Sequence, residues 1–335
     1  MLGIQKIDHL ARHLETTSEH LLYVSESADS YFEHLELFDP AKPEKRAREV
    51  VNVKGRLRIL QRRLLQNLIR PKHQPSQYSH GGVRGRHIKS NVANHIESFF
   101  AFTTDIANFY PSISHKRVYN LFVNDFKCSP DVARICTKLC THRHHLALGL
   151  ITSPILADRL MLHVDYRIGK LCENHDIIYT RFVDDITLSS YYPIKKGSFS
   201  TILVDILGSC GFKVNAKKHL EGLEGLGRLA DGKCITKLEI KRGKICVRSE
   251  FFEEITNQLL RAHDLACCGK GGDHYYTPGQ IYGRIQFVEW INAGQAVILK
   301  RLYRSIDWQK VESKARSIGL VATRKQLTRI LSKTD

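Results

Sequence analysis

Three aspartates stand at the ends of apolar segments, where their carboxylates could bind metal ions. Asp184 and Asp185 are adjacent in residues 181–190 (RFVDDITLSS), among residue types that favour strands. Two neighbouring carboxylates repel each other, and burying both is costly unless a cation neutralises them. Asp105 ends another apolar segment and would add a third carboxylate. We therefore predict that the three acids hold two divalent ions roughly 4 Å apart, as in nucleotidyl transfer.

The adjacent acids have a simpler alternative explanation, because an Asp-Asp pair in isolation is more often a solvated turn. Residues 177–189 (IIYTRFVDDITLS) consist of two apolar runs interrupted by the acids, which predicts a hairpin with the acids at its tip. In a strand, Asp184 and Asp185 would point to opposite faces, whereas a tip position leaves one or both available to Mg²⁺.

The rest of the chain is predicted to form the elements that position these acids. Residues 99–106 (FFAFTTDI) are expected to be a short strand ending on Asp105. The spacing of apolar residues elsewhere predicts helices over 1–38 and 115–140, a helix within 199–217 that ends near Gly211, helices from 251 onward, and a hairpin over 234–248. Helices, then a sheet carrying acids, then helices again indicate an α+β enzyme.

Two basic segments precede the first acid. Residues 42–69 predict a basic strand, a turn at Lys54-Gly55 and an amphipathic helix with one apolar and one positive face. Residues 79–91 (SHGGVRGRHIKSN) place three glycines among basic side chains, which lets backbone and guanidinium groups approach phosphates. A plain flexible loop is the alternative for this second segment.

The composition favours a polyanionic partner. The 335 residues are 42% hydrophobic, enough for a sizeable core, and 51 Lys+Arg against 34 Asp+Glu give a formal charge of +17. An anionic membrane would also attract this charge. The sequence has no apolar run of eighteen residues and no signal peptide after Met1. We therefore expect a cytoplasmic protein that binds nucleic acid and no membrane.

Nine cysteines are scattered through apolar stretches, and the odd number argues against a disulfide framework. We expect reduced core thiols. The densest polar cluster, residues 136–145, combines Cys136, Cys140 and three histidines, which are ligand types that zinc accepts. It lacks the close cysteine spacing of common structural zinc sites. A buried helix face followed by a basic turn facing nucleic acid is the simpler interpretation.

Several motifs resemble those of reverse transcriptases. Residues 179–189 (YTRFVDDITLS) resemble the catalytic box of this family, in the form familiar from bacterial retrons. Residues 105–113 (DIANFYPSI) look like its first metal motif. The resemblance implies an α+β right-hand polymerase, with N-terminal helices and fingers over 1–98, a palm with interspersed fingers helices over 99–248 and a helical thumb over 249–335.

The resemblance also implies a role for individual residues. It makes Asp105, Asp184 and Asp185, with Ile106, the binding site for two Mg²⁺ ions, with Mn²⁺ as a substitute, and it makes Tyr110 the aromatic gate that favours dNTPs. Lys217 or Lys218 would lie near the departing pyrophosphate. The expected nucleotide-binding residues are Tyr110, Phe109, Arg46, Arg48, Lys54, Gly149 and Lys217. The expected RNA-binding residues are Arg84, Arg86, Asn91, His95, Thr236 and Arg284.

The sequence departs from the family pattern in two motifs. Ala147 and Leu148 replace the usual Pro-Gln ahead of Gly149, and leucine cannot offer the amide hydrogen bonds expected of the glutamine. Residues 235–237 (ITK) stand where Val-Thr-Gly is usual in retrons, near the element that contacts the cognate RNA. These departures leave open a defence-associated reverse transcriptase that is not a retron enzyme.

The expected function is RNA-directed DNA synthesis on a dedicated noncoding RNA, with dNTPs as substrates. If the enzyme is of the retron type, the RNA also primes synthesis through a 2′-hydroxyl, and the DNA product is the branched msDNA. An effector protein encoded nearby would then take part in antiphage defence. Two alternatives stay open. The first is a catalytically weak RNA-binding scaffold, and the second is an RNA polymerase or protein-primed DNA polymerase on the same fold.

Overall fold

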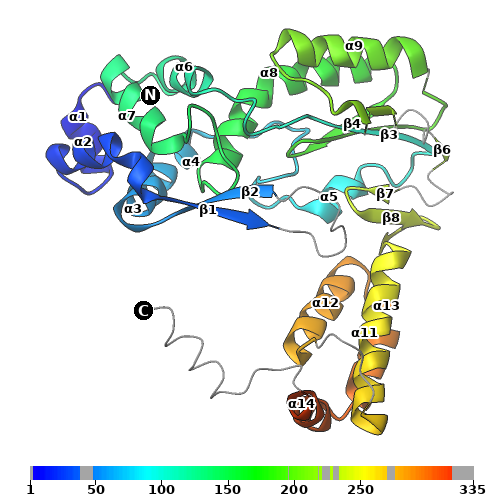
Figure 1. Cartoon of the computed structure of the whole chain (residues 1–335). Helices are drawn as coiled ribbons and strands as arrows, with labels where there is room; N and C mark the ends of the chain where they lie inside the picture. The colour runs from blue at the N-terminus through cyan, green and yellow to red at the C-terminus, as the bar shows by residue number, and fades with distance from the viewer. Residues whose placement is uncertain are drawn as a thin grey trace. The chain divides into compact units, whose positions relative to one another are not determined.

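The computed structural model describes residues 3–37, 48–194, 196–217, 219–220, 227–228, 234–269 and 276–318 (Figure 1). The chain forms two compact units, Met1–Gly227 and Arg228–Asp335. Helices and antiparallel sheets occur together in the first unit, which confirms the α+β prediction. No helix in the described ranges is both long enough and apolar enough to span a bilayer.

The N-terminal region is helical only in part. Helices α1 (Ile7–His13) and α2 (Ser18–Glu26) and the short 3₁₀ turn η1 (Ala28–Tyr31) are followed by strand β1 (Phe32–Leu37). β1 pairs antiparallel with β2 (Arg48–Val53). The prediction of helices through residue 38 was therefore wrong over the last six described residues, because pairing with a distant strand decides their conformation.

The basic strand and helix expected after residue 42 are confirmed where the structure describes them. Helix α3 (Gly55–Leu64) begins directly after Lys54, buries Leu57, Leu60 and Leu64 and exposes basic residues on its other face. The π-helical turn η2 (Leu65–Ile69) and α4 (Arg70–Lys72) continue it. Helix α5 (Ile88–Ala93) begins at His87, whose side chain accepts a hydrogen bond from the backbone N–H of Ser90.

A four-stranded sheet carries the predicted acids. Its strand order is β4-β5-β3-β6, with β3 (Phe100–Asp105), β4 (Ile178–Phe182), β5 (Asp185–Ser190) and β6 (Gly227–Arg228). Helices α8 (Ser153–Glu173) and α9 (Lys196–Ser209) lie over one face of it (Figure 1). The strand ending on Asp105 and the hairpin of β4 and β5 are both confirmed.

The helix predicted over residues 115–140 consists of two helices, α6 (His115–Asn124) and α7 (Pro130–Cys140). The break has a local cause. Lys127 has φ +55°, a left-handed conformation that a helix interior does not contain. The Ser129 hydroxyl then accepts a hydrogen bond from the backbone N–H of Val132, and Pro130 occupies the first helical position.

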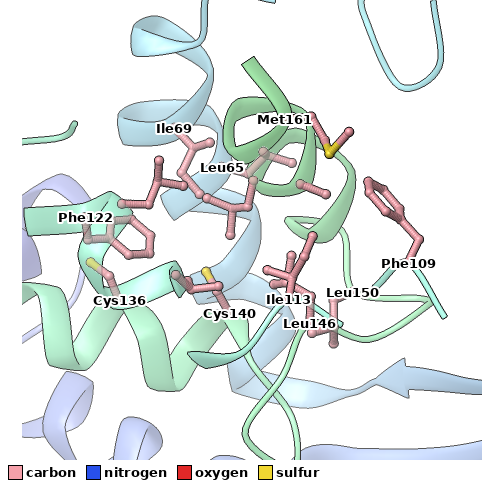
Figure 2. Close-up of a cluster of buried hydrophobic side chains, with 14 of the residues drawn as sticks. Leu65, Ile69, Phe109, Ile113, Phe122, Cys136, Cys140, Leu146, Leu150 and Met161 are labelled. Atoms are coloured by element: carbon pink, nitrogen blue, oxygen red, sulfur yellow. The ribbon is translucent and has the colours of Figure 1, made fainter. Parts of the chain in front are cut away.

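The core of the first unit joins these helices to the sheet. Phe122, Cys136 and Cys140 lie in the same buried cluster as Phe109 and Met161 (Figure 2). All nine cysteines are unpaired, and burial raises the pKa of the Cys140 thiol to about 12. The prediction of core thiols holds for five of the nine, since Cys210 and Cys234 are partly buried and Cys267 and Cys268 are exposed.

The second unit combines a small sheet with four described helices. Its strands are β7 (Cys234–Ile235), β8 (Leu238–Lys241) and β9 (Lys244–Val247), so the hairpin predicted over 234–248 is confirmed. The helices are α11 (Ser249–Cys268), α12 (Pro278–Ile291), α13 (Ala293–Ser305) and α14 (Trp308–Ser317). The division into fingers, palm and thumb stays a prediction.

Candidate active site

The ends of β3 and β5 bring the three aspartates together. In the antiparallel register, Asp105 is opposite Asp185, and the backbone N–H of Ile106 donates to the Asp184 carbonyl at 3.1 Å. Val183 and Asp184 form the two-residue connection between β4 and β5. The acids are therefore at the tip of a hairpin that lies against a third strand.

The three carboxylates act on one another strongly. Burial, followed by the charges of Asp105 and Asp185 and a side-chain hydrogen bond with Asp105, raises the pKa of Asp184 to about 7. Carboxyl groups this close favour holding a proton between them unless a cation takes its place. The electrostatics are thus those of a site suited to a positive charge.

The donor set fits a hard divalent cation. Carboxylate oxygens are the ligands that Mg²⁺ and Mn²⁺ prefer, and Mg²⁺ sites commonly use one or two carboxylates plus water and phosphate oxygens. Within the described ranges, no group of three or more His, Cys, Asp or Glu side chains is arranged so that it could hold a metal ion. This finding covers the zinc-type cluster around Cys136 as well. The acids would accordingly supply part of a coordination shell, with water or substrate completing it.

Val183 holds an unusual conformation at the hairpin tip. Its φ is +60°, a left-handed value that is strained for a β-branched residue and that glycine normally supplies in two-residue hairpin turns. Gly81 packs directly against it, because a Cβ at Gly81 would lie 2.5 Å from the Val183 nitrogen. The glycine-rich loop and the acidic turn are therefore in close contact, and strain of this kind is typical of functional sites.

The predicted aromatic gate lies beside the acids. Tyr110 is partly buried, and burial together with the charge of Asp184 raises its pKa to about 12. Phe109 instead belongs to the core, where its ring lies 6.1 Å from the ring of Phe212 (Figure 2 shows Phe109 in its cluster). Tyr110 is thus close enough to Asp184 to be affected by its charge, and the Phe109 ring lies 5.4 Å from the Tyr110 ring. The role of Tyr110 as an aromatic gate stays a prediction.

Asn215 is a neighbour of the acids that the sequence did not single out as a site residue. Its backbone N–H donates to the Asp105 carbonyl at 2.7 Å, and its side-chain amide lies 3.4 Å from Asp105 Oδ2. In the opposite direction, the Ala107 N–H donates to the Lys213 carbonyl at 2.8 Å. Asn215 stands two residues before Lys217, so its nearness to a predicted site residue was the available signal.

The other predicted nucleotide-binding residues are distributed around the first unit. Gly149 lies against β2, since the Leu148 carbonyl accepts from the Val51 N–H at 2.8 Å and a Cβ at Gly149 would lie 2.2 Å from the Val51 carbonyl oxygen. Lys54 is exposed and forms an ion pair with Glu33 at 2.7 Å. Lys217 is exposed. Arg46, Lys218 and the side chain of Arg48 fall outside the described part of the chain.

The predicted RNA-binding residues differ in exposure. Arg84 is exposed on the glycine-rich loop, whereas Arg86 donates to the backbone carbonyls of Ser76 and Ser79 at 2.5 and 2.6 Å and so braces that loop. Asn91 and His95 are fully buried. Their side chains lie inside the fold, so direct contact with RNA is disfavoured.

His95 has an internal role. Its ring nitrogens lie 2.6 Å from Ser189 Oγ and 2.7 Å from Thr180 Oγ1, so it links β5 to β4. Burial lowers the pKa of His95 to about 3, which keeps the ring neutral. The sequence suggested an RNA contact because the motif match carried no information on burial.

The two RNA-binding candidates of the second unit lie on different elements. Thr236 and Lys237 form the β7–β8 turn with φ +48° and +67°. Such a turn favours glycine, so the lysine that replaces the usual glycine occupies a strained position. Arg284 on α12 pairs with Glu254 at 2.7 Å and lies over the ring of Phe251 at 5.6 Å.

Comparison with known proteins gives consistent matches. A profile described as reverse transcriptase (RNA-dependent DNA polymerase) matches residues 41–237. The retron Ec86 reverse transcriptase of Escherichia coli is 28% identical over 237 residues, which cover 71% of each chain. The retron Se72 enzyme of Salmonella heidelberg is 33% identical over 146 residues, covering 44% of this chain and 38% of the relative.

Two further comparisons cover more of this chain. The retron Mx65 reverse transcriptase of Myxococcus xanthus is 26% identical over 267 residues, covering 74% of this chain and 59% of the relative. Among solved structures, a foamy viral protease-reverse transcriptase in complex with double-stranded DNA matches 87% of this chain and 44% of its own at 15% identity, with a TM-score of 0.45.

Proposed function

The chain belongs to the reverse transcriptase (RNA-dependent DNA polymerase) family, in its retron type, and we propose that it copies a dedicated noncoding RNA into DNA at Asp105, Asp184 and Asp185. The observation that carries this proposal is the contact between Asp105 and Asp184 at the strand ends. Burial, together with the charges of Asp105 and Asp185, raises the pKa of Asp184 to about 7, so a cation at this contact would be favoured.

Each residue of the site has its own role in this proposal. Bound Mg²⁺ or Mn²⁺ would supply activation of the primer hydroxyl and neutralisation of the triphosphate. Asp105 and Asp184 hold the ions, and Asp185 adds negative charge. Tyr110 packs against the sugar of the incoming nucleotide and disfavours a 2′-hydroxyl. Lys217 would stabilise the leaving pyrophosphate.

We further infer a retron-type reaction, supported by the retron enzymes among the relatives. The same noncoding RNA would act as template and, through an internal 2′-hydroxyl, as primer, which yields branched msDNA. A nearby effector protein in antiphage defence would be the partner. The three subdomains over 1–98, 99–248 and 249–335 complete the proposal, with the helices over 249–335 serving as thumb.

Incorporation of labelled dNTPs by protein purified with its own RNA tests the polymerase activity. Asp184→Ala/Asp185→Ala should abolish the signal, whereas Asp205→Ala, an exposed acid on α9, should leave it unchanged. Equal signal from the acidic double variant would refute the assignment. If that equal signal is at background level, it would favour the catalytically weak RNA-binding scaffold.

The priming group is tested on the product itself. If the RNA primes through a 2′-hydroxyl, RNase treatment should leave DNA attached to a short branched remnant that a debranching enzyme removes. A product that stays in the phenol phase after RNase treatment would indicate protein priming. A product with a free 5′ end would point to a defence-associated enzyme with another priming mode.

A further inference from the structure

A buried arginine lies directly beneath the acidic turn. Arg181 is 1% exposed, and among the described residues it is the largest side chain that is fully buried. It makes a two-pronged contact with Asp165 at 2.8 and 2.8 Å and a third bond to Asp158 at 2.7 Å, both on helix α8. Its remaining terminal nitrogen, Nη1, donates to the Val183 carbonyl at 2.9 Å.

The last of these bonds acts on the backbone of the site. The Val183 carbonyl belongs to the peptide group that leads into Asp184, so a fixed carbonyl fixes the plane of that peptide. On the other side, the Asp184 carbonyl accepts from the Ile106 N–H at 3.1 Å. The backbone of Asp184 is thus held from both directions, by Arg181 and by the chain that carries Asp105.

The turn needs such support because its conformation is unfavourable. Val183 has φ +60°, which is strained for a β-branched residue, and a strained conformation persists only where its surroundings impose it. Gly81 closes one side of the turn. Arg181 adds a second contact with the turn, and two aspartates of helix α8 fix the orientation of its guanidinium.

We propose that Arg181 is a positioning residue, which holds the Val183–Asp184 peptide so that the Asp184 carboxylate faces Asp105. The inference rests on the proposed function, since it concerns the same acids. Arg181 acts through the backbone and does not touch the reacting groups. Asp158 and Asp165 orient the guanidinium so that its Nη1 donates to the Val183 carbonyl.

Arg181→Lys is the direct test. An ammonium keeps the positive charge that faces the two aspartates, but it offers one nitrogen where the guanidinium uses three, so it cannot also reach the carbonyl. A misplacement of about 1 Å at a reacting group costs roughly a hundredfold in rate. We expect a loss of that order in dNTP incorporation, together with weaker Mn²⁺ binding.

Mn²⁺ binding is read from the electron paramagnetic resonance signal of the free ion, independently of polymerisation. We expect the variant to need about tenfold more Mn²⁺ for half-saturation. Arg63→Lys is the matched control, because Arg63 also donates to backbone carbonyls, of Leu14 and Glu15, and pairs with a carboxylate. It should bind Mn²⁺ and incorporate dNTPs like the wild type.

A second variant covers the case in which Arg181→Lys does not fold. Arg181→Gln/Asp158→Asn removes one charge of each sign, so the formal charge of the buried group is unchanged, and it also removes the bond to Val183. We expect it to fold, as judged by circular dichroism and thermal unfolding. We also expect it to bind Mn²⁺ more weakly than the wild type does. A folded Arg181 variant with wild-type Mn²⁺ binding would overturn the inference.

The two hypotheses fail in different ways. If the wild-type protein with its RNA incorporates no dNTPs, the proposed function fails, and the Mn²⁺ comparison still decides the role of Arg181. If the wild type is active and a folded Arg181 variant matches it in rate and in Mn²⁺ dependence, the positioning role fails and the polymerase stands.

Discussion

Asp184→Asn should stabilise the metal-free protein, by an amount that grows with pH. The pKa of Asp184 rises from 3.8 in the unfolded chain to about 7 in the folded protein. The folded state therefore binds the proton more tightly, and the stability gained from this carboxyl at low pH is lost as the pH rises through about 7.

The size of the effect follows from the two pKa values. At 1.36 kcal/mol per pKa unit, the titration of Asp184 lowers the free energy of unfolding by about 2 kcal/mol at pH 5 and about 4 kcal/mol at pH 8. Both values are relative to acid conditions, in which this carboxyl is protonated in the folded and the unfolded protein. Asparagine carries no charge, and its amide can donate to Asp105 in place of the shared proton. The advantage of the variant should thus grow by about 2 kcal/mol across this range.

Urea denaturation of RNA-free protein in chelator, at pH 5 and at pH 8, measures the effect. Adding Mg²⁺ at pH 8 should stabilise the wild type and leave Asp184→Asn nearly unchanged, because the ion replaces the proton only where both carboxylates are present. Asp205→Asn controls for the loss of an exposed acid. A stability gain that is independent of pH, or a variant less stable than the wild type at pH 8, would refute the reasoning.

Four further outcomes are expected. Tyr110→Val should raise rNTP incorporation relative to dNTP by roughly tenfold to a hundredfold, measured in competition on one template. Gly149→Ala should lower the free energy of unfolding by about 2 kcal/mol or more, because its Cβ would collide with the Val51 carbonyl at 2.2 Å. Lys237→Gly should raise the free energy of unfolding of the second unit by about 1 kcal/mol, since glycine accepts φ +67° without strain. The affinity for RNA, measured by filter binding, should fall by roughly a hundredfold or more between about 50 and about 200 mM salt if counterion release from phosphates drives binding.

Local pattern was enough to predict the strands that carry the acids. Residues 99–106 and 177–189 have the alternation and the strand-forming types that fix their conformation, so the hairpin with Asp184 at its tip followed from the sequence. Tyr110 beside Asp184 followed from the motif. The metal-binding, nucleotide-binding and RNA-binding roles stay predictions.

Features that depend on distant partners were not predictable in this way. Strand β1 forms because residues 48–53 pair with it, and its own apolar spacing also suits a helix. The contact of Arg181 with Asp158 joins residues 23 positions apart on different elements. Burial of His95 likewise depends on Ser189, far along the chain. Sequence patterns report local periodicity, whereas these contacts arise only once the elements pack.

The distribution of the cysteines makes the chain selectively reactive. Cys128, Cys136, Cys140, Cys172 and Cys246 are buried, and burial holds the thiols of Cys140 and Cys172 at a pKa of about 12, so few thiolates form there at neutral pH. Cys267 and Cys268 are exposed at the end of α11. A maleimide fluorophore should therefore attach first to the second unit. Such a label would report on the motion of that unit as RNA and the growing DNA bind, without any engineered cysteine.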